Sequence, residues 1–280
     1  MAVFIRLAGM KYLFFVCLFS SFSFFANAQL FEGIVKDAKT NQLLPYVNVG
    51  IIGKATGTVS DTDGKYSIAL TGHDADSLRI SMVGYRPQSF LIADLIKGYS
   101  TYKTTNLQPD LREIKEVRVT NHKWKQVVLG NTTHSQSTNA GFTSNKLGNE
   151  IGAIIKIKRA PTYLKQFNAS IAGDVSDSVK LRLNFYTVKG GLPDKPLQLQ
   201  SIFVNVKKGD KKITVDLEPY FIVVDDKFFV SLEWIINARG HGIMFSASLL
   251  SSAVISRETS QAEWEKEGIA GVGFNVLADY

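Results

Sequence analysis

The sequence predicts an all-β protein in which a smaller N-terminal β-sandwich is followed by a larger, jelly-roll-like β-sandwich. Three observations support this fold class. Apolar and polar residues alternate with a period of two along most of the chain, whereas helical periodicity is scarce. Turn residues interrupt these runs about every 8 to 12 positions, a spacing typical of antiparallel sandwiches. The 280 residues include a single cysteine, so the fold must be held by apolar cores rather than disulfides.

Residues 1–28 have the features of a secretory signal peptide. Arg6 and Lys11 supply a positive start, residues 12–25 are apolar, and Ala26-Asn27-Ala28 fits the small-x-small cleavage pattern. The apolar run is shorter than the roughly 20 residues that a spanning helix needs. We therefore expect export to the periplasm, the outer membrane or the medium, with no transmembrane segment in the mature chain.

Cleavage after residue 28 removes Cys17, which excludes disulfides, zinc-thiolate sites and cysteine nucleophiles from the mature chain. The removed segment holds two of the 32 basic residues and no acidic ones, so 30 basic residues remain against 25 acidic ones. The densest basic cluster, residues 207–212, contains Gly209-Asp210 and is interpreted as a solvated hairpin tip. An anionic glycan or lipopolysaccharide contact is the alternative, and export argues against nucleic acid as a partner.

The first domain is expected over residues 30–97. Its predicted strands cover residues 31–36, 46–52, 57–60, 65–70, 77–83 and 88–92. Between Asp61 and Gly64 the sequence Asp-Thr-Asp-Gly suits a tight turn, because aspartate bonds its own backbone and glycine accepts positive φ. A calcium loop is the alternative, but no acidic residue follows at the distance of a bidentate ligand.

The motif residues of this domain are Gly33-x-Val35-x-Asp37, Leu44-Pro45-x-Val47-Asn48-Val49, Gly57-Thr58, Asp61-Thr62-Asp63-Gly64-x-Tyr66 and Val83-Gly84-Tyr85. Together they resemble the carboxypeptidase regulatory-like (carboxypeptidase D regulatory-like) domain of Bacteroidetes proteins. The resemblance implies a transthyretin-like β-sandwich without catalytic residues. It also implies a carbohydrate-binding-like fold, which makes a glycan or another cell-envelope component the preferred partner.

Residues 98–120 are expected to form a linker or a closing strand, with residues 115–120 as the strand. The order of a regulatory-like module followed by such a strand is similar to that in TonB-dependent transporters of the outer membrane. In those proteins the module precedes a much larger membrane part, and residues 121–280 are too few for it. That architecture is therefore not expected here.

The second domain is expected over residues 121–280 and has no family assignment. Its candidate strands include residues 151–158, 164–171, 179–188, 201–206, 212–217, 228–236, 242–249 and 271–277. In residues 179–186, Val179, Leu181, Leu183 and Phe185 share one face, opposite Lys180, Arg182, Asn184 and Tyr186. Such alternation is typical of a strand with one buried and one solvated face.

No catalytic, cofactor or metal site is predicted. His73, His122, His134 and His241 lack zinc-site spacing, although a carboxylate pair assembled from distant residues stays open. Aromatic side chains offer the only binding candidates, because flat rings stack on sugars. Trp264 lies in a polar segment, with packing at a sandwich edge as the alternative, and Trp124 lies between two lysines, with packing between the domains as the alternative. Trp234 is on the apolar face of its strand and is expected in the core.

The leading hypothesis is an exported, non-enzymatic binding or structural protein of the bacterial envelope, with a glycan as the preferred ligand. The second is an accessory subunit that docks to an outer-membrane protein or surface assembly through an edge strand of the first domain. The third is a hydrolase with a site within residues 121–280. Ser77 and Ser178 follow aspartates in a tripeptide similar to Bacteroidetes O-glycosylation sites, and their modification is left open.

Overall fold

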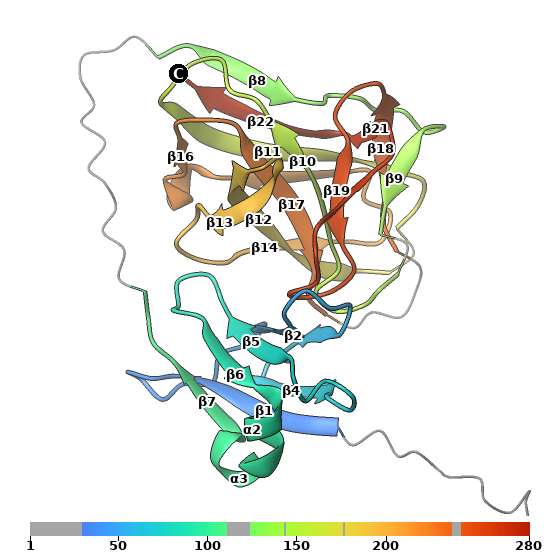
Figure 1. Cartoon of the computed structure of the whole chain (residues 1–280). Helices are drawn as coiled ribbons and strands as arrows, with labels where there is room; N and C mark the ends of the chain where they lie inside the picture. The colour runs from blue at the N-terminus through green and yellow to red at the C-terminus, as the bar shows by residue number, and fades with distance from the viewer. Residues whose placement is uncertain (1–29, 111–123, 143, 176, 237–241) are drawn as a thin grey trace, which may run out of the picture.

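The protein forms two β-sandwiches, the smaller one built from the N-terminal part of the chain (Figure 1). The computed structural model describes residues 30–110, 124–142, 144–175, 177–236 and 242–280. The predicted signal peptide with Cys17, the predicted strand at 115–120, and His122 and His241 lie outside the described residues. The all-β fold class predicted from the alternating pattern is confirmed.

The first sandwich has a three-stranded and a four-stranded sheet, in the orders β4-β1-β7 and β3-β2-β5-β6. Their bounds are β1 Leu30–Asp37, β2 Asn48–Ile51, β3 Gly57–Val59, β4 Lys65–Ala69, β5 Ser77–Ser81, β6 Gln88–Leu91 and β7 Thr104–Leu107. The helices α2 Ile92–Lys97 and α3 Tyr99–Tyr102 connect β6 to β7. All six predicted strands of this domain are present, and β7, inside the expected linker, pairs in parallel with β1. The domain boundaries themselves stay a prediction.

The motif residues of the first domain contact one another in pairs. Gly33 leaves room for the Tyr66 ring, because a Cβ at Gly33 would lie 2.4 Å from the Tyr66 hydroxyl oxygen. The Tyr85 hydroxyl donates to Asp37 at 2.8 Å, which ties the end of β1 to the loop after β5. The Asp61 carboxylate accepts the backbone N–H groups of Asp63 and Lys65, which confirms the predicted turn.

The Asp37–Tyr85 bond gives a pH-dependent prediction. Backbone N–H groups, with Thr40 first, and the Tyr85 hydroxyl lower the pKa of Asp37 below its usual 3.8, while burial and Asp37 raise the pKa of Tyr85 to about 12. Stabilisation from Asp37 is therefore present above pH 3.8 and lost as the pH falls further. Stabilisation from Tyr85 is present below its ordinary pKa of 10.0 and lost as the pH rises towards 12.

We expect Tyr85→Phe to melt at a lower temperature than the parent protein throughout the middle pH range. The difference should shrink below pH 3.8 and above pH 10, as each partner loses its native ionisation state. Thermal unfolding followed by circular dichroism across pH measures it. A difference that stayed constant with pH would contradict the assigned role of the hydrogen bond.

The second sandwich has a seven-stranded sheet in the order β13-β12-β17-β10-β19-β20, with β14 also paired to β12. The opposing eight-stranded sheet has the order β21-β18-β11-β22-β8, with β15 and β16 paired to β11 and β9 to β18. The bounds are β8 Gln126–Gly130, β9 Asn139–Gly141, β10 Glu150–Ile155, β11 Thr162–Ala172, β12 Val179–Lys189, β13 Leu192–Pro196, β14 Ile202–Val206, β15 Lys212–Asp216, β16 Val223–Val224, β17 Phe228–Trp234, β18 Met244–Leu249, β19 Val254–Arg257, β20 Glu265–Glu267, β21 Ala270–Val272 and β22 Phe274–Asp279. A 3₁₀ turn, η1 Glu218–Tyr220, lies between β15 and β16.

Large apolar side chains fill the space between these two sheets. Phe167 and Phe274 meet edge to face at 5.3 Å between ring centroids, and Trp234 packs on Phe142 at the same separation. Trp234 is fully buried, which confirms its prediction as a core residue. Rings packed in this way contribute both buried area and a preferred geometry. The core is thus a rigid support for the outer faces of the sheets.

The basic segment at residues 207–212 is a solvated turn, as predicted, but the hairpin assignment is wrong. Asp210 accepts the backbone N–H of Lys207, and Gly209 has φ +83°. However, β14 before the turn pairs with β12, and β15 after it pairs with β11 in the opposite sheet. The turn therefore carries the chain from one sheet to the other.

Helices are minor elements in the part of the chain that the structure describes. Within that part, none is long and apolar enough to cross a membrane.

Candidate functional site

Four charged side chains form a row across the outer face of the seven-stranded sheet. Arg182 on β12 is in register with Glu233 on β17, which is in register with Glu150 on β10. Glu150 is in turn in register with Arg257 on β19. The order of charges across the four strands is therefore positive, negative, negative, positive. We call these residues the charged row.

The arginines compensate for the two neighbouring carboxylates. Arg182 Nη2 lies 2.8 Å from Glu233 Oε2, and Arg257 Nη2 lies 2.5 Å from Glu150 Oε2. The Asn184 amide donates to both carboxylates, at 2.9 Å to Glu150 and 2.8 Å to Glu233. Like charges directly opposite on adjacent strands destabilise a sheet unless they are compensated. All four charged side chains are at least nine-tenths buried, so each one depends on its partners.

The row also changes the ionisation of its neighbours. Burial raises the pKa of Tyr186 well above its usual value, and the adjacent Glu150 raises it further. The Tyr186 hydroxyl accordingly stays protonated and donates to Glu150 at 3.0 Å. Burial acts to lower the pKa of Arg257, but Glu150 and Tyr186 outweigh it and the pKa is raised. Arg257 is therefore a permanent cation.

The first domain covers one end of the charged row. Arg182 donates to the Tyr46 carbonyl at 2.7 Å and to Asn48 Oδ1 at 2.5 Å. Tyr46 has φ +60°, a left-handed conformation that is uncommon for a bulky residue. Its ring packs on Phe203 of the second domain at 5.3 Å. This strained residue thus contacts the second domain through both its carbonyl and its ring.

The segment after β19 forms a further contact between the domains, beside that of Tyr46 and Asn48 and that of Gly84 with Leu199. Gly50 and Gly57 pack so closely on it that an added Cβ would lie 2.0 Å and 2.4 Å from the Ser260 carbonyl oxygen. Gln261 accepts the backbone N–H of Gly53 at 2.9 Å and donates to Ser81 at 3.0 Å. The two domains are therefore joined by backbone contacts at a fixed separation.

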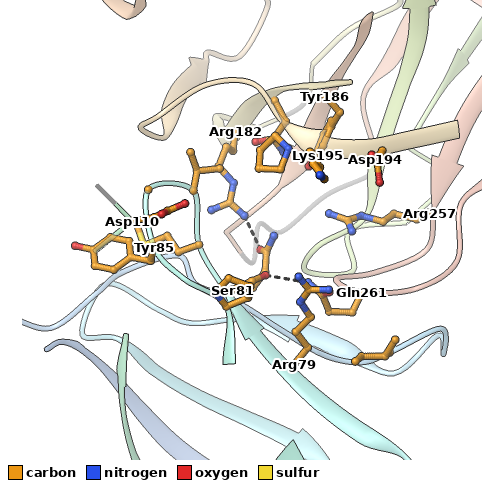
Figure 2. A pocket seen from close by; sticks show the side chains of 18 of the residues that line it. Arg79, Ser81, Tyr85, Asp110, Arg182, Tyr186, Asp194, Lys195, Arg257 and Gln261 are labelled. Carbon is orange, nitrogen blue, oxygen red and sulfur yellow. Dashed lines mark hydrogen bonds between the residues drawn. The ribbon is translucent and has the colours of Figure 1, made fainter. Parts of the chain in front are cut away.

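A cavity of about 780 Å³ lies between the domains, beside the charged row. Figure 2 shows Arg79 and Ser81 reaching it from the first domain and Arg182, Tyr186 and Arg257 from the second. Trp264 lines the same cavity, with its ring 4.6 Å from the Arg257 guanidinium carbon and edge to face with Tyr186. The cavity therefore combines an aromatic side chain with several guanidinium and amide groups, and Lys195 and the carboxylates of Asp110 and Asp194 also line it. Polar groups that converge on a pocket in this way can fix the orientation of a bound ligand.

The fold and motif contacts of the first domain agree with a family comparison. Residues 31–119 match the CarboxypepD_reg-like domain. The family expected from the motif residues is thereby confirmed for this segment, which contributes Arg79, Ser81 and Tyr85 to the cavity.

Two curated relatives are both TonB-dependent receptors. The chain is 30% identical to TonB-dependent receptor P3 of Formosa agariphila over 122 residues, which is 44% of this chain and 11% of the receptor. It is 36% identical to TonB-dependent receptor SusC of Bacteroides thetaiotaomicron over 76 residues, which is 27% of this chain and 7% of the receptor. The chain thus spans about a tenth or less of the length of either relative.

The structure separates the two tryptophans that sequence analysis proposed for ligand binding. Trp264 lines the cavity between the CarboxypepD_reg-like domain and the second domain. Trp124 lies ahead of β8, is 38% exposed and does not line this cavity. A role of either residue in binding stays a prediction. His73 pairs with Asp76, and His134 bonds the buried Ser170, so neither lies at the cavity.

The alternating pattern alone does not predict the charged row, because it places Arg182, Asn184 and Tyr186 on a solvated face. The alternation is correct, since Leu181, Leu183 and Phe185 lie in the core. The opposite face is covered by the CarboxypepD_reg-like domain and the segment at Trp264 instead of water. One signal was available, because Glu233 is the single charged residue of β17, in which every other residue except Ser231 is apolar. An isolated charge of that kind often has a buried partner.

Proposed function

We propose that this chain is an exported, non-enzymatic binding protein of the bacterial cell envelope whose ligand, preferably a glycan, occupies the cavity between its two domains. The observation that carries the proposal is the polar, Trp264-lined cavity of about 780 Å³. Its size suits a small saccharide, since ligand pockets range over about 300–1,000 Å³. The match to TonB-dependent receptors supports an envelope context.

The hydrogen bonding of Glu150 supports binding over hydrolysis. Two neighbouring carboxylates are the arrangement that glycosidases use, so this pair deserves comparison with such a site. Glu150 Oε1 accepts from Asn184, Tyr186 and Ser231, and Oε2 accepts from Arg257. Glu233 keeps one oxygen without a partner among the described residues, but both glutamates are fully buried, so neither carboxylate is open to a substrate. The pair is better suited to fixing the position of the arginines.

Glycan binding is tested by Trp264→Ala, with Trp124→Ala as the matched control. We expect the parent protein to bind at least one glycan on an array, and Trp264→Ala to bind it about tenfold more weakly or not at all, because stacking on the ring is lost. Trp124→Ala should bind as the parent does, since Trp124 does not line the cavity. Isothermal titration with the glycan identified on the array gives the affinities.

Circular dichroism and thermal unfolding of each variant show whether it is folded. Binding that Trp124→Ala abolishes and Trp264→Ala leaves intact would move the site away from the cavity. An array that stays blank with the folded parent protein would argue against a glycan ligand.

A second candidate is an accessory subunit that docks to an outer-membrane protein, and the sheet order favours it. In the described residues, β4 and β7 end their sheet without a further strand. An unpaired edge can accept a strand from another chain. Crosslinking through a photoreactive residue at Ser67, an exposed position on β4, tests this candidate. Capture of a TonB-dependent receptor would support docking, and the absence of any envelope partner would argue against it.

A further inference from the structure

We propose that the cavity between the two domains binds an anionic group, a carboxylate, sulfate or phosphate, held between Arg79 of the first domain and Arg257 of the second. The inference rests on the proposed binding function and specifies the chemical class of the ligand. Figure 2 shows the two guanidinium groups entering the cavity from opposite domains. They are separate from the Arg182 contacts that join the domains.

Arg257 has hydrogen-bonding capacity that the protein does not use. Its side chain is 9% exposed, Nη2 donates to Glu150, and the Trp264 ring covers the guanidinium. Its Nε is buried and has no hydrogen-bond partner among the described residues. A buried N–H without an acceptor costs free energy. The guanidinium is thus held in position at the cavity wall, and its buried Nε is a donor that the described residues leave unused.

Arg79 presents the same feature from the first domain. It lies on β5 in register with Gly50, the glycine that contacts Ser260, and this places it at the domain interface. Its Nε is buried without an acceptor, and no described carboxylate forms an ion pair with it. Arg79 as a whole is half-buried, and an anion in the cavity would supply both a counter-charge and acceptor oxygens for its guanidinium.

The donors set the chemistry of the ligand. A guanidinium has five N–H donors and no acceptor, and it keeps its charge throughout the accessible pH range. The ligand must therefore supply acceptor oxygens, and a negative charge would also balance Arg79. Carboxylate, sulfate and phosphate groups share this chemistry and accept guanidinium hydrogen bonds in pairs. On a saccharide, such a group leaves the neighbouring ring free to contact Trp264.

The test is isothermal titration of the full chain at constant ionic strength. The probes are sodium sulfate, sodium phosphate, an oligogalacturonate and a neutral galactan oligomer of the same length. We expect the galacturonate to bind at least about tenfold more tightly than the neutral oligomer, as charge-assisted hydrogen bonds are stronger than neutral ones. Arg79→Gln should weaken binding of the anion about tenfold or more.

Arg159→Gln is the matched control, because Arg159 is exposed and lies outside the cavity. The substitution removes one positive charge, as Arg79→Gln does. Arg257→Lys gives a second variant that keeps the charge beside Glu150 but removes the Nε donor. It should also weaken anion binding while the protein remains folded by circular dichroism. Binding of sulfate or phosphate alone, sensitive to Arg79→Gln, would support the anion site and assign it to a free ion.

Equal affinity for the acidic and neutral oligomers, or equal effects of Arg79→Gln and Arg159→Gln, would overturn the inference. If the neutral oligomer then still bound in a Trp264-dependent manner, the proposed binding function would stand. If no saccharide bound, the proposed glycan ligand would fall as well. The two failures are therefore distinguishable.

Discussion

Arg182→Met is expected to lower the free energy of unfolding by about 3–5 kcal/mol, the usual cost of removing one partner of a buried ion pair. The substitution leaves Glu233 charged and fully buried, and among the described residues Asn184 is then its one remaining hydrogen-bond donor. It also removes both hydrogen bonds from Arg182 to the first domain. Denaturant unfolding of the full chain, followed by tryptophan fluorescence, measures the change.

The double variant Arg182→Met, Glu233→Leu separates the charge effect from the lost contacts. It removes both charges and replaces them with apolar side chains of similar volume, a change that is often nearly neutral. We expect it to recover much of the loss seen in the single variant. Arg159→Met, at an exposed position, should change the stability by no more than about 0.5 kcal/mol. A single variant as stable as Arg159→Met would contradict the role of the ion pair.

Gly50→Ala is expected to separate the two domains. The added Cβ would lie 2.0 Å from the Ser260 carbonyl oxygen and 2.9 Å from its carbon, and these backbone atoms cannot rotate away. Overpacking of this kind costs about 1–3 kcal/mol or more, and the domain contact is where the strain can be released. Small-angle scattering should show a larger radius of gyration. Circular dichroism should still show the β signal of both sandwiches.

Gly209→Ala is the comparison for this effect. Gly209 lies in a turn with φ +83° and has open space around its Cβ position. Alanine there costs about 1–2 kcal/mol of local backbone strain. It does not approach the first domain, so the radius of gyration should stay that of the parent. A Gly50→Ala protein with an unchanged radius would show that the contact can adapt.

The first domain was largely predictable because its signals are local. Alternating residues define β1 to β6, and turn residues such as Gly64 separate them. In the second domain, β13 escaped prediction because Pro193 and Pro196 argue against a strand, and it lies at the sheet edge where proline is tolerated. The exposed strand β20 has charged residues at all three positions, so it carries no alternation.

The site itself was less predictable because it depends on contacts between domains. A period of two shows that Arg182 and Glu233 face away from the core, but it does not show what covers them. Arg79 and Arg257 meet the same cavity from positions far apart in the sequence. Trp264 was found as a candidate because its segment is polar. Its place beside Arg257 follows only from the fold of the segment after β19.

The contact of Arg182 with the first domain bears on whether that domain could be exchanged for a related one. One acceptor, the Tyr46 carbonyl, belongs to the main chain and would be supplied by any module with the same backbone course. The other, Asn48 Oδ1, is a side chain that a substitute module need not carry. A chimera with a foreign module would therefore satisfy half of this contact by shape alone. The other half is specific to this sequence, which makes the two domains a matched pair.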